Sequence, residues 1–168
     1  MNTLVQLRAA TEERSRAIVA RYPDWPCRKG CDHCCRSLAG PLELTQTEWR
    51  EVEAGFALLP ETTRAEVNAR WAAPSRTCPF LDPAHGDCLI YEHRPIACRA
   101  YGFYVDERGI GLYCGIIRGK VDAGEFAEAV WGNHSALESR LAALDPSSAG
   151  LAPQRIPVDV KGCSVGGG

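Results

Sequence analysis

The chain has 168 residues, with 19 Lys and Arg against 21 Asp and Glu and a formal net charge of −2. An apolar fraction of 45% and a charged fraction of 24% are typical of a globular protein and exclude bulk disorder. The balanced charge excludes strong polycationic attraction to nucleic acid or anionic lipid, and we expect no nucleic-acid partner. The length suits one domain that can bury its own core.

Nine residues are cysteine, a fraction below the roughly 8–10% typical of small secreted disulfide scaffolds. Residues 1–8 run directly into charged positions and contain no apolar run of signal-peptide length. No stretch approaches the roughly 20 apolar residues of a membrane span, so we expect no membrane partner. We therefore expect a cytoplasmic protein, in which clustered thiols stay reduced and serve as metal ligands or catalytic groups.

The first half of the chain predicts three helices. Residues 3–21 carry spaced apolar positions among charges, and the prolines that follow end this helix. Thr45 and Glu48 match the capping-box pattern, so a second helix is expected to begin at Thr45. Pro60 is expected to open a third helix that runs through Trp71.

The second half predicts less regular structure. Residues 78–83 are too rich in proline for a helix or strand, and residues 89–91 fit a brief strand or a buried turn. Segments 101–105 and 110–114 flank a four-residue loop and predict a β-hairpin. Apolar residues at helical spacing predict a helix over residues 123–144, capped by Asp122.

These elements predict a mainly α fold with a small β-hairpin, in which a helical frame surrounds a loop-built cysteine metal centre. We expect residues 1–144 to form a single cysteine-cluster domain. Residues 145–168 are rich in Pro, Gly and Ser and are predicted to be a flexible tail.

Eight of the nine cysteines fall into two groups along the chain. Closely spaced cysteines lower the loop entropy of bringing thiolates within about 2.3 Å of one ion. A lone cysteine is more often a small buried hydrophobe or simply exposed, and we interpret Cys163 in that way. The predicted metal ligands are Cys27, Cys31, Cys34 and Cys35 in the first group, and Cys78, Cys88, Cys98 and Cys114 in the second.

The count of eight thiolates fits two four-ligand sites of zinc or iron–sulfur type, or one site with four spare thiols. Cys34 and Cys35 are adjacent, and consecutive side chains diverge from the backbone. They can both serve one centre only if the local chain bends strongly. We expect instead that they face two centres, or that one binds while the other packs.

Basic residues flank both groups of cysteines. Burying a thiolate-rich centre is costly unless cations lie near it. Arg94 and Arg99 flank Cys98, and we expect them to support the ligands from outside the coordination sphere. His33 lies between two predicted ligands and is expected to be a surface or supporting residue rather than a ligand.

Three segments resemble the CxxCxxCC cysteine-cluster family, which is described as a zinc- or iron-chelating domain. They are Cys27-x3-Cys31-x2-Cys34-Cys35, Cys78-Pro79-Phe80-Leu81, and the block from Cys88 through Arg94-Pro95 and Cys98-Arg99 to Tyr101. This chain departs from the family in placing three residues, not two, after the first cysteine. The resemblance implies metal binding. A related segment occurs in flagellin lysine N-methylases, where an iron–sulfur centre is implied.

The leading hypothesis is a cytosolic metalloprotein with one or two centres of iron–sulfur or zinc. Basic neighbours and uneven cysteine spacing favour iron–sulfur, since structural zinc sites tend to use paired C-x2-C knuckles. The alternatives are an iron or iron–sulfur enzyme that modifies a protein or peptide side chain, and a structural zinc-binding interaction protein. In the enzyme, Arg94, Arg99, Tyr101 and Tyr104 would line the pocket.

Overall fold

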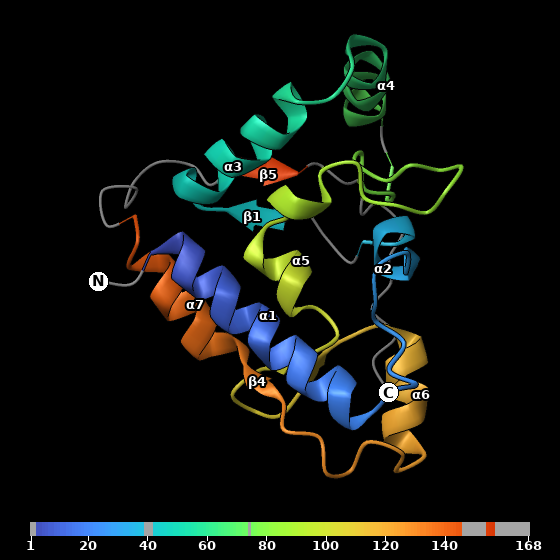
Figure 1. Ribbon diagram of the computed structural model, residues 1–168, viewed down its shortest axis with the longest axis vertical. Helices are drawn as coiled ribbons and strands as arrows, with labels where there is room; N and C mark the ends of the chain where they lie inside the picture. The colour runs from blue at the N-terminus through green and yellow to red at the C-terminus, as the bar shows by residue number, and fades with distance from the viewer. Residues whose placement is uncertain (1–2, 39–41, 74, 146–153, 157–168) are drawn as a thin grey trace.

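The computed structural model describes residues 3–38, 42–73, 75–145 and 154–156 (Figure 1). Helices dominate and the strands are short, which confirms the predicted fold class. No helix in these ranges is long and apolar enough to cross a membrane. In chain order the elements are α1 (Leu4–Arg21), α2 (His33–Arg36), β1 (Leu42–Leu44), α3 (Gln46–Ala57), α4 (Glu61–Ala72), the 3₁₀ turn η1 (Tyr91–His93), α5 (Ile96–Ala100), β2 (Tyr104–Val105), β3 (Gly111–Leu112), α6 (Gly115–Asp122), β4 (Gly132–Asn133), α7 (His134–Ala142) and β5 (Gln154–Ile156).

Two hydrophobic clusters form the interior. Helix α1 packs against α5 and α7 (Figure 1), and α3 packs against η1 and β1. The Trp25 cluster gathers the buried residues Leu4, Leu7, Ile18, Trp25, Ile96, Ala100, Phe103, Tyr104, Cys114, Ile117, Phe126 and Leu137. The Phe80 cluster gathers Leu44, Val52, Val67, Cys78, Phe80, Leu81 and Ile90.

The three helices predicted for the first half are confirmed by α1, α3 and α4. Thr45 precedes α3, where its side-chain oxygen accepts from the Glu48 N–H at 3.2 Å and its own N–H donates to the Glu48 carboxylate at 3.2 Å. This reciprocal pair satisfies two N–H groups that have no partner within the helix. Pro60 directly precedes α4, as predicted.

The single helix predicted over 123–144 is wrong. Asp122, its expected cap, is the last residue of α6, and Gly124 follows with a φ of +78°, a conformation that favours glycine and ends a helix. Gly132 then pairs with β2 as part of the parallel strand β4. Helix α7 begins only after Asn133, whose side chain accepts a backbone N–H at 2.9 Å.

The predicted hairpin is confirmed by β2 and β3, which pair antiparallel with Tyr104 opposite Leu112. β4 adds to β2 in parallel, which gives the strand order β3-β2-β4. A second sheet pairs β1 with β5, antiparallel. β5 belongs to the segment predicted to be a flexible tail, of which residues 146–153 and 157–168 lie outside the described residues.

The cysteine-bearing loops lie between the two clusters. The N–H of Cys78 donates to the carbonyl of Cys35 at 2.7 Å, and an isolated antiparallel bridge joins Leu81 to Cys88. Three short elements, α2, η1 and α5, supply the regular structure of this cysteine-bearing region. The sequence did not predict these three, because elements of three to five residues are too short to show a helical period.

Candidate metal centre

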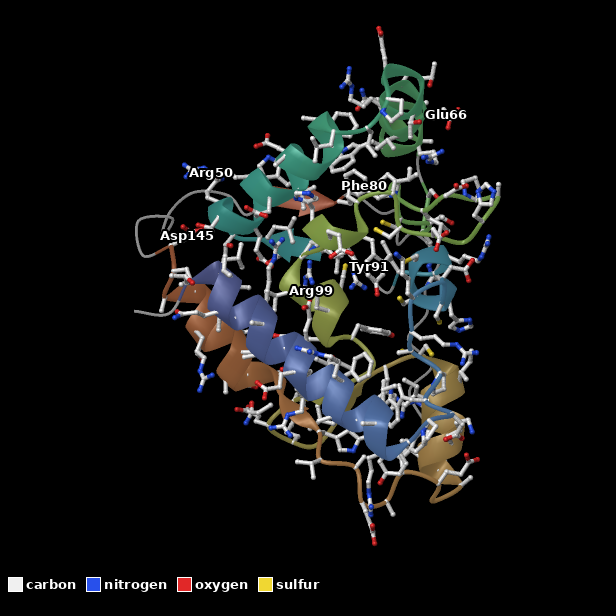
Figure 2. All side chains as sticks on the ribbon, in the orientation of Figure 1. Arg50, Glu66, Phe80, Tyr91, Arg99 and Asp145 are labelled. Carbon is white, nitrogen blue, oxygen red and sulfur yellow. The ribbon has the colours of Figure 1, made fainter. Side chains whose placement is uncertain are left out.

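Six cysteines line one cavity, which we call the inner cavity. Its volume is about 270 Å³, and its walls come from α2, α5, η1 and the loop before η1. Sulfur atoms gather around Tyr91, between α2 and α5 (Figure 2). The cysteines that line it are Cys31, Cys34, Cys35, Cys78, Cys88 and Cys98.

A second and larger cavity, which we call the outer cavity, adjoins the first. It has a volume of about 580 Å³, and α1 forms one of its walls with Glu12, Arg16 and Val19. Cys27 faces this cavity, together with three cysteines that also line the inner one: Cys31, Cys34 and Cys98. These three shared cysteines therefore lie where the two cavities meet.

Burial and mutual repulsion raise the pKa values of these thiols. Burial, followed by repulsion from Cys31 and Cys114, raises the pKa of Cys27 to about 12. Burial raises the pKa of Cys78 to about 12, and that of Cys98 well above its ordinary value, with Cys78 and Cys88 adding to the latter. A metal would have to displace protons from such thiols, since it binds the thiolate form.

The electrostatic repulsion between the thiols places the cysteines in two spatial groups, and these differ from the two groups along the sequence. Cys78, Cys88 and Cys98 influence one another, whereas Cys114 belongs with Cys27. Cys114 ends the β-hairpin and precedes α6, which brings it back to the N-terminal loop. The sequence could not show that Cys114 lies near Cys27, because this proximity depends on how the hairpin packs.

Cys34 lies close enough to both spatial groups to influence the pKa values of their thiols. Its charge raises the pKa of Cys27 in one group and of Cys98 in the other. The sulfur atoms of Cys34 and Cys35 lie 4.0 Å apart, and their hydrogen bond is the largest cause that raises the pKa of Cys34. The strong bend that adjacent cysteines require comes from the single turn of α2.

Arg94 places a fixed cation at both cavities. Its guanidinium carbon lies 3.5 Å from the centre of the Tyr91 ring, and its Nε donates to the Tyr91 carbonyl at 2.8 Å. Burial raises the pKa of Cys88, and the charges of Arg94 and Arg99 oppose that rise. Both terminal nitrogens of Arg94 are without a hydrogen-bond partner among the described residues.

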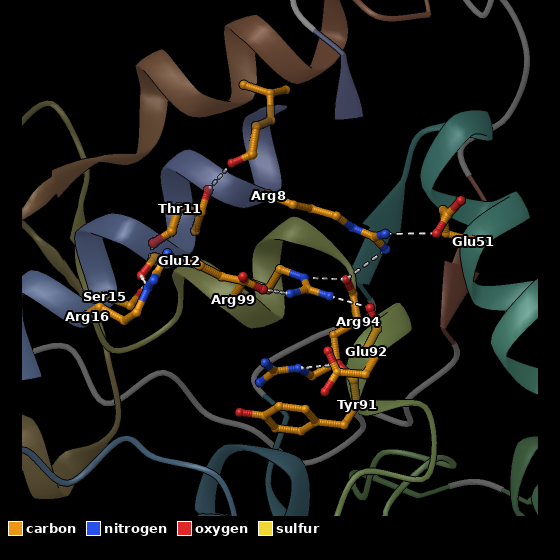
Figure 3. A network of polar contacts seen from close by, with 11 residues as sticks. Arg8, Thr11, Glu12, Ser15, Arg16, Glu51, Tyr91, Glu92, Arg94 and Arg99 are labelled. Atoms are coloured by element: carbon orange, nitrogen blue, oxygen red, sulfur yellow. Dashed lines mark hydrogen bonds and ion pairs between the residues drawn. The ribbon is translucent and has the colours of Figure 1, made fainter. Parts of the chain in front are cut away.

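Arg99 holds the backbone that carries Arg94 (Figure 3). Its side chain is 4% exposed, and it donates to the carbonyls of Arg94 and Glu92 and to the Glu12 carboxylate. Arg8 donates to the same Arg94 carbonyl at 3.4 Å and pairs with Glu51 at 2.8 Å. Nothing in the sequence marks Arg8 and Glu12 as parts of this network, because their pattern on α1 is that of a solvated helix face.

The other predicted site residues are placed as follows. Tyr101 lines both cavities, and burial with repulsion from Cys34 raises its pKa to about 12. His33 is exposed and is not among the described residues that line either cavity. Cys163 lies outside the described residues. Within the described ranges, no three Cys, His, Asp or Glu side chains stand in an arrangement that could hold a metal ion.

The CxxCxxCC family model, described as "Putative zinc- or iron-chelating domain", matches residues 26–120. The chain belongs to the CxxCxxCC family. The matched residues include all eight cysteines of the two cavities and their surroundings, together with Arg94, Arg99 and Tyr101. No curated protein and no solved structure matches the chain. The family describes a metal-binding protein, which agrees with the gathering of thiols between the two hydrophobic clusters.

Proposed function

We propose that the chain binds iron–sulfur through its clustered cysteines, in preference to zinc. Six cysteines around one cavity of about 270 Å³ carry this proposal. A single zinc ion needs its four sulfurs at about 2.3 Å, in a tight tetrahedron without internal space. A cluster with its own sulfides fills a larger volume and spreads its cysteine ligands further apart.

The cations near the cavities support the same choice. A cluster held by thiolates carries negative charge, and hydrogen bonds and nearby charges adjust its reduction potential. Arg94 lines both cavities, held on Tyr91 with its two terminal nitrogens available for such bonds. Zinc has no redox chemistry for an arginine to adjust.

The division of the cysteines favours two centres over one. Cys78, Cys88 and Cys98 would hold the first centre, and Cys27, Cys31 and Cys114 would contribute to the second. The adjacent Cys34 and Cys35 would each complete one of them. The eight described cysteines are free thiols, and clustered thiolate ligands suit the reducing, cytoplasmic compartment that we propose for the protein.

Anaerobic purification, followed by iron, zinc and acid-labile sulfide analysis, tests the metal. The iron–sulfur proposal expects a coloured protein with iron and sulfide in similar amounts. A colourless protein with stoichiometric zinc and no sulfide would overturn it.

Substitution of single cysteines tests the number of centres. With two centres, Cys98→Ser and Cys114→Ser should each remove about half of the iron, with different spectral changes. The matched control is Cys163→Ser, which should keep all of it. Equal and complete loss in both variants would favour one shared centre.

The outer cavity favours a second candidate function, that of an enzyme acting on a protein or peptide side chain. Catalytic metal sites keep a coordination position open to substrate. The outer cavity of about 580 Å³ is lined by Cys27 and Cys31, so it would give a substrate group room beside the second centre. Binding of cyanide to the iron, seen by electron paramagnetic resonance, would support an open position. Four sulfur ligands on every iron, from cysteine and sulfide together and measured by X-ray absorption, would exclude it.

A further inference from the structure

An aromatic hollow lies between α3 and α4, away from the outer cavity. Its volume is about 240 Å³, and it contains no cysteine. Four aromatic rings contribute to its walls: Trp49 and Phe56 from α3, Trp71 from α4 and Phe80 from the loop after it. Trp49, Phe56 and Trp71 are each half-buried, so the hollow opens to solvent.

The rings meet at steep angles instead of stacking flat. Trp49 and Trp71 have their centroids 5.8 Å apart and their planes at 71°, and Trp71 and Phe80 are 5.6 Å apart at 80°. Phe56 and Phe80 meet at 71°. Rings set nearly at right angles form a corner, in which a guest would lie beside more than one ring, with the nearly buried Phe80 at its base.

Two polar side chains stand at the hollow. Glu53, one turn after Trp49 on α3, is exposed and has no ion pair or hydrogen bond among the described residues. Asn68 reaches it from α4 and is equally without a described partner. Arg70 of α4 pairs with Glu66 at 3.8 Å and donates to the Pro79 carbonyl at 2.9 Å, so its described partners do not include Glu53.

The geometry points to a binding site for a quaternary ammonium group. Aromatic faces attract cations through their negative quadrupole, and several faces around one guest are the usual way to hold a methylated ammonium ion. The unpaired carboxylate of Glu53 gives the rim the opposite charge. A methylated ammonium has no N–H to leave unsatisfied, which suits walls that are mostly carbon.

Choline and its uncharged isostere 3,3-dimethylbutan-1-ol test the site on the purified full-length protein. The two have the same shape and differ in charge. The readout is the set of four tryptophan indole N–H signals in NMR, assigned by Trp→Phe variants. Choline should shift the signals of Trp49 and Trp71 and leave those of Trp25 and Trp131, which belong to the Trp25 cluster. The isostere should bind about fivefold more weakly or worse.

Matched variants distinguish a specific effect of the Glu53 charge on choline binding from the effect of losing any surface carboxylate. Glu53→Gln should weaken choline binding several-fold, and Glu13→Gln, an exposed carboxylate on α1, should not. A short peptide with one trimethyl-lysine, compared with its unmethylated form, distinguishes the sources of the group. Binding tighter than that of choline would indicate a protein partner, and equal binding a small molecule.

Equal binding of choline and its isostere would overturn the proposal, since the site would then be merely apolar. The absence of any shift at Trp49 and Trp71 at molar choline would overturn it as well. Neither result bears on the metal content, which is measured separately on the same preparation.

Discussion

The guanidinium of Arg99 donates to the backbone carbonyl of Arg94 at 3.0 Å, so one buried arginine holds the peptide that carries the other. Arg99 comes from α5, and its remaining nitrogens reach the Glu92 carbonyl and the Glu12 carboxylate on α1. The first helix, the η1 turn and the cysteine-bearing helix α5 are thereby joined at one side chain.

Replacing Arg99 by lysine should lower both stability and metal content. A lysine keeps the charge but cannot supply three nitrogens in a planar fork, so two buried carbonyls lose a donor. We expect the free energy of unfolding to fall by about 2–3 kcal/mol, measured by urea denaturation, with less bound metal per chain. The matched control is Arg21→Lys, whose ion pair with Glu128 is exposed at both ends and should leave both values unchanged. Equal effects in the two variants would show that the buried contacts of Arg99 contribute no more to stability or metal content than an exposed ion pair does.

Glu48 ties the start of α3 to the start of α5. Its carboxylate accepts from the Ile96 N–H at 2.9 Å and from the Thr45 N–H, and Glu48 as a whole is 2% exposed. Glu48→Ala leaves the buried Ile96 N–H and the partly buried Thr45 N–H unpaired and should lower the free energy of unfolding by about 2–3 kcal/mol. Glu48→Gln keeps an acceptor oxygen and should lower it less, and Glu13→Ala on the exposed face of α1 should have no effect.

The same carboxyl predicts a dependence of stability on pH. Burial raises the pKa of Glu48, although the N–H groups of Ile96 and Thr45 oppose the rise. A group whose pKa is raised in the folded state stabilises most below its ordinary pKa, and that stabilisation is lost as pH rises through the folded value. The free energy of unfolding of the wild type should therefore decline across this window relative to Glu48→Gln. Parallel pH profiles of the two proteins would contradict the assignment.

Local patterns in the sequence predicted the local parts of the fold. Thr45 and Pro60 mark helix starts by interactions within a few residues, and both positions were predicted correctly. The error over 123–144 has a non-local cause, because Gly132 leaves the helical pattern to pair with β2. The cysteine ligand pool was likewise visible as spacing, whereas the association of Cys114 with Cys27 depends on the packed hairpin.

Removal of the metal should loosen the junction between the two clusters. The cysteine loops have little regular structure, so bound metal is expected to supply much of their stability. Chelation should lower the melting temperature by roughly 10 °C or more. Arg99, buried in the structure, should become a new site of trypsin cleavage. An unchanged melting temperature and digestion pattern would mean that the packed clusters hold the loops without metal.

Gly102 makes room for Cys27. It has a φ of +92°, and a Cβ built on it would overlap the Cys27 sulfur. Gly109, in the hairpin turn, has a φ of +78° with nothing within 4 Å of its Cβ position. An alanine there would meet the conformational penalty of a positive φ but no steric overlap. Gly109→Ala should cost about 1–2 kcal/mol and keep the full metal content. Gly102→Ala should cost more and also reduce the bound metal, because the Cys27 side chain must move. Equal metal content in the two variants, measured alongside urea denaturation, would contradict a role of Cys27 as a ligand.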